Sequence, residues 1–163
     1  MKKLVLLLLV VTSAIAQQPD PDKAAIKATL DLWHKAAAEA QFKPYFALMT
    51  DDAVFIGTDA TENWQLDAFK AFAKPYFDKG KAWNFTVIER NIYLSPAKDF
   101  AWFDELLDTQ MKICRGSGVL KKVNGQWRIA HYVLSMTVPN DNVDAVIKLK
   151  KAFDDDLLKK LKP

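Results

Sequence analysis

The chain has 163 residues and is close to electrically neutral, with 23 Lys and Arg against 20 Asp and Glu and a formal net charge of +3. Two of these positive charges, Lys2 and Lys3, lie at the extreme N-terminus, so the rest of the chain carries only +1. This balance gives no compositional reason to expect nucleic-acid binding. One cysteine, Cys114, excludes an intramolecular disulfide.

Residues 1–16 have the pattern of a signal peptide that is removed on export. Lys2 and Lys3 precede an apolar run from residue 4 to residue 11, and Ala14 and Ala16 supply the small side chains that signal peptidase requires. The apolar run is too short to span a membrane. We therefore expect a periplasmic or secreted protein with no membrane association after cleavage. Taking 16 from 163 residues leaves 147, the size of one domain.

Cleavage is expected between Ala16 and Gln17, because Ala14 and Ala16 then occupy the two positions that need small residues. N-terminal sequencing of protein from the extracytoplasmic fraction checks this prediction. Recovery of that protein with Met1 still present would contradict it.

Helical patterns dominate the first half of the chain. Apolar residues at spacings of three and four predict an amphipathic helix over Asp22–Ala40 and a short helix over Phe42–Met49. A short strand is expected over Ala53–Gly57. A third helix should begin at Asp67 and end or kink at Pro75.

From Trp83 the period changes to two, which is typical of strands. Residues 83–94 and 101–107 are two expected strands, and the segments on either side of Asn124-Gly125, within residues 110–137, form an expected hairpin. These make a sheet of about four long strands. Residues 140–162 then show the pattern of an amphipathic helix.

The second arm of the hairpin is expected to place alternate side chains on one face of the sheet, namely Trp127, Ile129, His131, Val133 and Ser135. A two-residue type I′ turn would pair Val123 with Gln126 and set Cys114, Gly116, Gly118 and Leu120 opposite that face. A three-residue turn with a bulge at Gly125 would shift the pairing by one residue and set Arg115 near His131 and Ser135. We favour the bulged turn, because it supplies Ile113 and Val119 rather than glycines to the same wall.

The order of elements is accompanied by several recognisable motifs: residues 52–59 (DAVFIGTD), 62–64 (ENW), 101–104 (AWFD), 115–120 (RGSGVL) and 125–132 (GQWRIAHY), with Ser135 and residues 139–141 (PND). Together they resemble the SnoaL-like branch of the nuclear transport factor 2-like superfamily over residues 24–141. The resemblance implies an α+β fold, in which a cone-shaped, curved antiparallel β-sheet packs on N-terminal helices, as in a cystatin-like barrel. We accordingly expect a SnoaL-like domain over residues 17–141 and a C-terminal amphipathic helical tail over residues 142–163.

Members of this superfamily hold a pocket between the sheet and the long helix, and they include isomerases, dehydratases, polyketide cyclases and proteins without known catalysis. In this chain the expected ligand-binding residues are Trp33, Phe55, Trp64, Tyr76, Trp102, Arg115, Trp127, His131 and Ser135, with Phe72 and Ile129 also in the wall. A mostly apolar wall with a few polar groups favours binding of a small, largely apolar ligand.

Two other functions remain open. The first is an isomerase-, dehydratase- or cyclase-type enzyme that uses His131 with Asp104 or Glu105, because a carboxylate in an aromatic cavity can exchange a proton with a nearby histidine. The second is a dimerisation or protein-interaction module, such as a homodimer. No cofactor is expected, and no metal site either, because neither of the two histidines has a carboxylate at ligand spacing.

Overall fold

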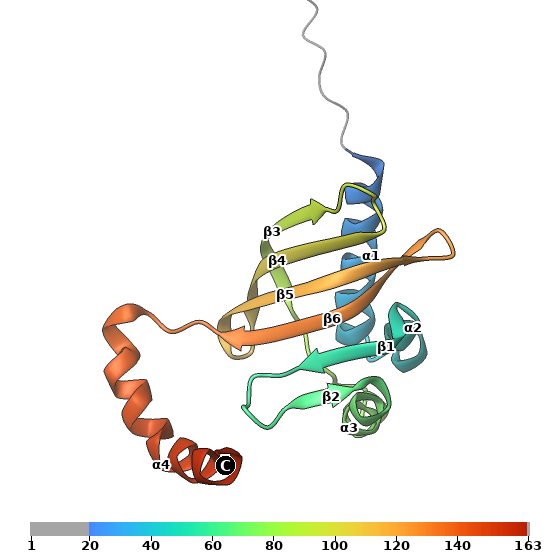
Figure 1. The fold of residues 1–163 in the computed structure, drawn as a ribbon. Helices are drawn as coiled ribbons and strands as arrows, with labels where there is room; N and C mark the ends of the chain where they lie inside the picture. The colour runs from blue at the N-terminus through green and yellow to red at the C-terminus, as the bar shows by residue number, and fades with distance from the viewer. Residues whose placement is uncertain (1–19, 163) are drawn as a thin grey trace, which may run out of the picture.

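The structure is a computed structural model that describes residues 20–162 (Figure 1). The predicted signal peptide lies outside the described residues. In chain order the elements are α1 (Pro21–Ala38), α2 (Phe42–Ala47), β1 (Met49–Ile56), β2 (Asn63–Gln65), α3 (Leu66–Asp78), β3 (Thr86–Leu94), β4 (Phe100–Thr109), β5 (Lys112–Val123), β6 (Gln126–Met136), a 3₁₀ turn η1 (Asn140–Asn142) and α4 (Val143–Leu161).

Helix α1 begins where its sequence favours a helix start. Asp20 accepts a hydrogen bond from the backbone N–H of Asp22 at 2.9 Å, and Pro21 occupies the first helical position, where a missing N–H costs nothing. The helix buries Ile26, Leu30 and Trp33, which recur at spacings of three and four. That stripe packs against β3 and β6, so α1 lies across one face of the sheet (Figure 1).

The sheet has six strands in the order β2-β1-β6-β5-β4-β3. All neighbouring strands are antiparallel except β1 and β6, which are parallel. The sheet curves without closing, with α1 behind it and α3 beside β2 (Figure 1). The predicted α+β class with helices on a curved sheet is confirmed, and β1 and β2 extend the four long strands expected from the sequence.

The turn of the central hairpin differs from the favoured prediction. Val123 pairs with Gln126, and both Asn124 (φ 50°) and Gly125 (φ 78°) adopt the left-handed conformation that a type I′ turn requires. The predicted three-residue turn is therefore wrong. Asparagine tolerates this conformation better than other non-glycine residues, so the Asn-Gly pair can form the tighter turn.

A bulge does occur, but further along the hairpin. Leu120 pairs with Ile129 and Val119 pairs with His131, so Ala130 is an extra residue in β6. A single extra residue reverses which side chains face inward. The prediction that Trp127 and His131 share one face is consequently wrong.

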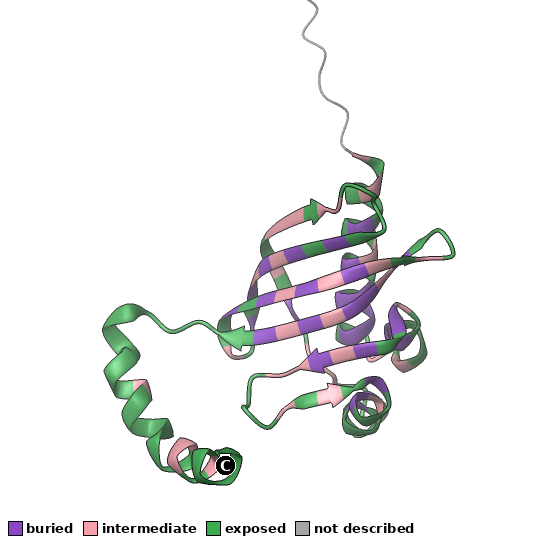
Figure 2. Cartoon of the chain, viewed as in Figure 1, coloured by how far each residue is buried: buried purple, intermediate pink, exposed green. Residues whose placement is uncertain are grey.

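The burial pattern along β6 shows this reversal at the bulge. Before the bulge, Trp127 and Ile129 are buried; after it, Tyr132 and Leu134 are buried, whereas the alternation places His131, Val133 and Ser135 on the outer face. Helix α4 confirms the predicted helix near the C-terminus, but it is almost wholly exposed (Figure 2). Within residues 20–162 no helix is long and apolar enough to cross a membrane.

Candidate functional site

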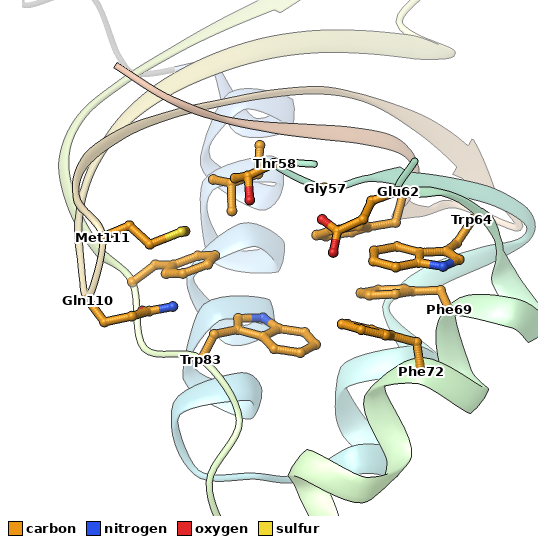
Figure 3. A pocket seen from close by; sticks show the side chains of 12 residues that line it. Gly57, Thr58, Glu62, Trp64, Phe69, Phe72, Trp83, Gln110 and Met111 are labelled. Atoms are coloured by element: carbon orange, nitrogen blue, oxygen red, sulfur yellow. The ribbon is translucent and has the colours of Figure 1, made fainter. Parts of the chain in front are cut away.

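An aromatic cavity of about 180 Å³ lies between α3, the end of β1 and the β4–β5 turn (Figure 3). Its walls come from five parts of the chain, residues 55–64, 69–72, 83–85, 110–111 and 134, that the sheet and α3 bring together. The lining residues are Phe55, Gly57, Thr58, Glu62, Trp64, Phe69, Phe72, Trp83, Phe85, Gln110, Met111 and Leu134.

The aromatic rings of this lining pack face to face. The centroids of Phe55 and Phe69 are 4.0 Å apart and those of Trp64 and Phe72 are 4.3 Å apart, both in stacked geometry. Phe69 and Phe72 are one helical turn apart on α3 and therefore present neighbouring rings. Trp83 also stacks on Phe69, with 5.8 Å between the ring centroids. Such mutual stacking holds the wall in one shape.

Glu62 supplies the carboxylate of the cavity. Its side chain points into the space between the rings (Figure 3), and its Oε2 accepts one hydrogen bond, from the backbone N–H of Asp59 at 3.2 Å. The turn that carries it is closed by the Gly57 N–H, which donates to the Glu62 carbonyl at 2.9 Å. Thr58 and Gln110 are the other polar residues of the lining.

A second group of polar side chains lies deeper in the fold, around Glu105. This residue is fully buried, and its Oε1 accepts hydrogen bonds from His34 Nε2 at 2.8 Å and from the Tyr132 hydroxyl at 3.0 Å. Its Oε2 accepts one from Arg90 Nε at 2.8 Å, and Arg90 also bonds Asp31 at 2.7 Å. We call Glu105, His34, Arg90 and Tyr132 the buried network.

Opposing effects set the pKa of the Glu105 carboxyl. Burial raises the pKa, but the hydrogen bond from His34 and the charges of His34 and Arg90 outweigh it, so the pKa lies below its ordinary value. Burial and the nearby Glu105 charge raise the pKa of Tyr132 well above its ordinary value. Glu105 is therefore an ionised structural partner.

The buried network does not line the cavity. The ring of Phe85, which does, contacts His34 with 5.9 Å between centroids, and Phe55 contacts Tyr132 at 5.5 Å. One layer of rings thus separates the cavity from Glu105. A ligand in the cavity would meet these rings and not the acid.

Of the residues expected in the pocket, the structure brings Phe55, Trp64 and Phe72 together around the cavity. Tyr76 is half exposed beside it, in a neighbouring hollow shared with Phe72. Trp33 is buried elsewhere and stacks on Tyr45 at 4.9 Å.

Trp127 and Ile129 are buried but stand apart from the cavity. The Trp127 Nε1 donates to Asp22 Oδ1 at 2.9 Å, which joins β6 to the start of α1. Trp127 instead lines a separate hollow with Thr29 and Leu48.

The remaining expected site residues lie on the outer face of the sheet. Trp102 is 50% exposed and stacks on Tyr93, and Arg115 pairs with Asp104 at 3.5 Å. His131 and Ser135 face outward because the bulge at Ala130 reverses the alternation. Asp104 and Glu105 do face opposite sides as their adjacency requires, but the histidine that reaches Glu105 is His34.

Several lining residues were not predicted: Gly57, Thr58, Glu62, Phe69, Trp83, Phe85, Gln110, Met111 and Leu134. Glu62 lies two residues before Trp64 in the motif at residues 62–64, and this position is the signal that could have identified it as a lining residue. Gln110 and Met111 carry no such signal, since they belong to a turn between two strands. Among residues 20–162, no three His, Cys, Asp or Glu side chains cluster as a metal ion would require.

The chain belongs to the SnoaL-like domain family, whose model matches residues 26–139. This match confirms the resemblance inferred from the sequence motifs. No curated protein matches the sequence.

Solved structures with the same fold carry varied names. A dehydratase candidate of the nuclear transport factor 2-like family from Streptomyces avermitilis is 9% identical, with a TM-score of 0.62 over 74% of this chain and 100% of that one. An aromatic ring hydroxylase candidate from Novosphingobium aromaticivorans is 14% identical, with a TM-score of 0.62 over 76% and 94%. The association domain of C. elegans CaMKII is 19% identical, with a TM-score of 0.58 over 70% and 95%. At these identities the likeness shows the fold alone.

Proposed function

We propose that this protein is exported and binds one small, largely apolar ligand in the aromatic cavity. The observation that carries the proposal is the cavity itself, with six aromatic side chains and few polar groups in its lining. An apolar hollow with a small number of polar groups is the usual form of a small-molecule site.

The size of the cavity limits the ligand. Its volume is about 180 Å³. An engineered apolar cavity of about 150 Å³ holds one benzene molecule, and pockets for drug-sized ligands begin at about 300 Å³. The enclosed part of the ligand is therefore one ring or a short branched chain.

Binding is better supported than the enzymatic alternative. An acid and a base must reach the reacting atoms of a ligand. His131 and Asp104 face outward, and Glu105 is fully buried with partners on both oxygens. The pair that the sequence suggested thus has no access to the cavity. The names of the dehydratase and hydroxylase candidates describe those proteins and do not alter this geometry.

Filling the cavity from the β4–β5 turn should weaken ligand binding. Met111→Trp places a larger side chain at the β4–β5 turn, where Met111 is half-buried in the lining. We expect saturable binding of ethylbenzene to the wild type by titration calorimetry and a loss of at least about tenfold in affinity in this variant.

Ile113→Trp is the matched control, because Ile113 lies two residues away, is 47% exposed and does not line the cavity. This variant should bind ethylbenzene as the wild type does. Equal loss in both variants, or no saturable binding in the wild type, would refute the proposed site.

A homodimer stays a prediction. Exposed apolar side chains support it: Phe100 and Trp102 on the outer face of β4, and Ile147, Phe153 and Leu161 on α4. Exposed apolar side chains that gather into one patch mark protein contacts. Light scattering of the purified protein should give twice the monomer mass.

A further inference from the structure

We propose that the ligand of the aromatic cavity is a cation, in which an apolar ring or chain carries an ammonium-type group that Glu62 and the surrounding rings recognise. This inference rests on the proposed binding function and adds the charge of the ligand to it. Three observations on the lining lead to it.

The first is that the Glu62 carboxylate has spare hydrogen-bonding capacity. It is half-buried and accepts one backbone hydrogen bond, of 3.2 Å, although a carboxylate has about four acceptor positions. Glu105 in the same protein is fully partnered by His34, Tyr132 and Arg90. Glu62 is therefore the acid that has room for a donor from outside the chain.

The second observation is that no positive charge of the protein compensates Glu62. Within residues 20–162, the lining holds no lysine, arginine or histidine, and no ion pair involves Glu62. Lys70 and Lys74 of the adjacent α3 pair with Asp67 and Asp78 instead. An uncompensated carboxylate in an apolar wall favours a cation and repels an anion.

The third observation is the set of ring faces next to the carboxylate. Trp64 and Trp83 lie around the space into which Glu62 points (Figure 3). The face of an aromatic ring carries partial negative charge and attracts ammonium groups, most strongly when the ring is tryptophan. The carboxylate and the rings therefore favour the same charge on the ligand.

The absence of a side chain at Gly57 leaves room for the carboxylate in this position. A Cβ added at Gly57 would lie 2.1 Å from Glu62 Oε2, far closer than two such atoms can approach. Gly57→Ala must displace the end of the Glu62 side chain while leaving its charge in place. The variant thus tests the position of the carboxylate separately from its presence.

Three probes of similar size and different charge test the inference: benzylammonium, ethylbenzene and benzoate. Calorimetric titration of the wild type at pH 7 should show benzylammonium binding about tenfold more tightly than ethylbenzene, which a free energy of about 1.4 kcal/mol provides. Benzoate should not bind measurably. Ethylbenzene that binds as tightly as benzylammonium would overturn the inference and leave the proposed function standing. Failure of both to bind would overturn both.

Variants then locate the source of the selectivity. Glu62→Gln should remove most of the tenfold advantage of benzylammonium over ethylbenzene, and Gly57→Ala should reduce that advantage with the charge retained. Asp67→Asn is the control, since it removes the same charge from an exposed position outside the lining. An unchanged benzylammonium advantage in Glu62→Gln would overturn the role of the carboxylate. If Glu62→Gln does not fold, the three-probe comparison on the wild type still decides the charge of the ligand.

Discussion

Replacing Arg90 with methionine should lower the free energy of unfolding by about 3–5 kcal/mol, because the change leaves the fully buried Glu105 without its arginine partner. The Arg90 side chain is 5% exposed and joins β3 to both Glu105 and Asp31. Methionine keeps much of its length but none of its hydrogen bonds. Urea unfolding followed by circular dichroism measures the difference.

Arg115→Met is the matched control for this prediction. Arg115 is 54% exposed and its partner Asp104 is 33% exposed, so this pair should contribute less than about 1 kcal/mol. A loss of stability in Arg115→Met as large as that in Arg90→Met would contradict the placement of Arg115 on the outer face.

The contribution of Glu105 should also depend on pH. Its pKa in the folded protein lies below the ordinary value of 4.5, so the stability it provides is complete above pH 4.5 and is lost as the pH falls through the folded-state pKa. The difference in unfolding free energy between the wild type and Glu105→Gln should therefore shrink below pH 4.5. A difference that stays constant down to acid unfolding would show that Glu105 is not ionised in the fold.

Trp127→Ala is expected to cost about 3–5 kcal/mol of unfolding free energy, as removal of a buried tryptophan generally does. Trp127 is 5% exposed, and its indole N–H donates to Asp22, so its loss affects both the core and the start of α1. Trp102→Ala, at a position that is 50% exposed, should cost much less.

The Trp127→Ala variant also distinguishes an effect on unfolding free energy from an effect on ligand affinity. Trp127 does not line the aromatic cavity, so Trp127→Ala should keep ethylbenzene affinity within about twofold of the wild type at temperatures where it remains folded. Unchanged stability would place Trp127 at the surface, and lost binding would make it part of the ligand site.

Local patterns in the sequence predicted the elements well. The apolar spacing of Ile26, Leu30 and Trp33 predicted the buried stripe of α1. The adjacency of Asp104 and Glu105 in a strand predicted that one of the two side chains faces inward. Prolines were less informative, since Pro75 lies inside α3 without ending it.

The composition of the site depended on a feature that no local pattern revealed. Alternation assigns His131 to the same face as Trp127 unless a residue is inserted, and Ala130 is that residue. Alanine gives no signal of a bulge, as a glycine in a strand would. His34 was similarly inconspicuous, because its role depends on Glu105 from a strand far along the chain.

The cavity lining was hard to predict for a related reason. Trp83 and Phe85 precede β3, and Gln110 and Met111 form a turn, so their convergence depends on the curvature of the sheet and not on periodicity. Phe69 follows the apolar spacing of α3 and carries no further signal in the sequence. Its contacts with Phe55 and Trp83 follow from how α3 packs on β1.

The central claim, that a ligand occupies the aromatic cavity, is tested most directly by the indole N–H signals of the five tryptophans. In a ¹H–¹⁵N spectrum titrated with ethylbenzene, the signals of Trp64 and Trp83 should shift saturably, because both residues line the cavity. The signals of Trp102 on the outer face and Trp127 near α1 should stay in place. Shifts of Trp102 or Trp127 with Trp64 and Trp83 unmoved would contradict the claim.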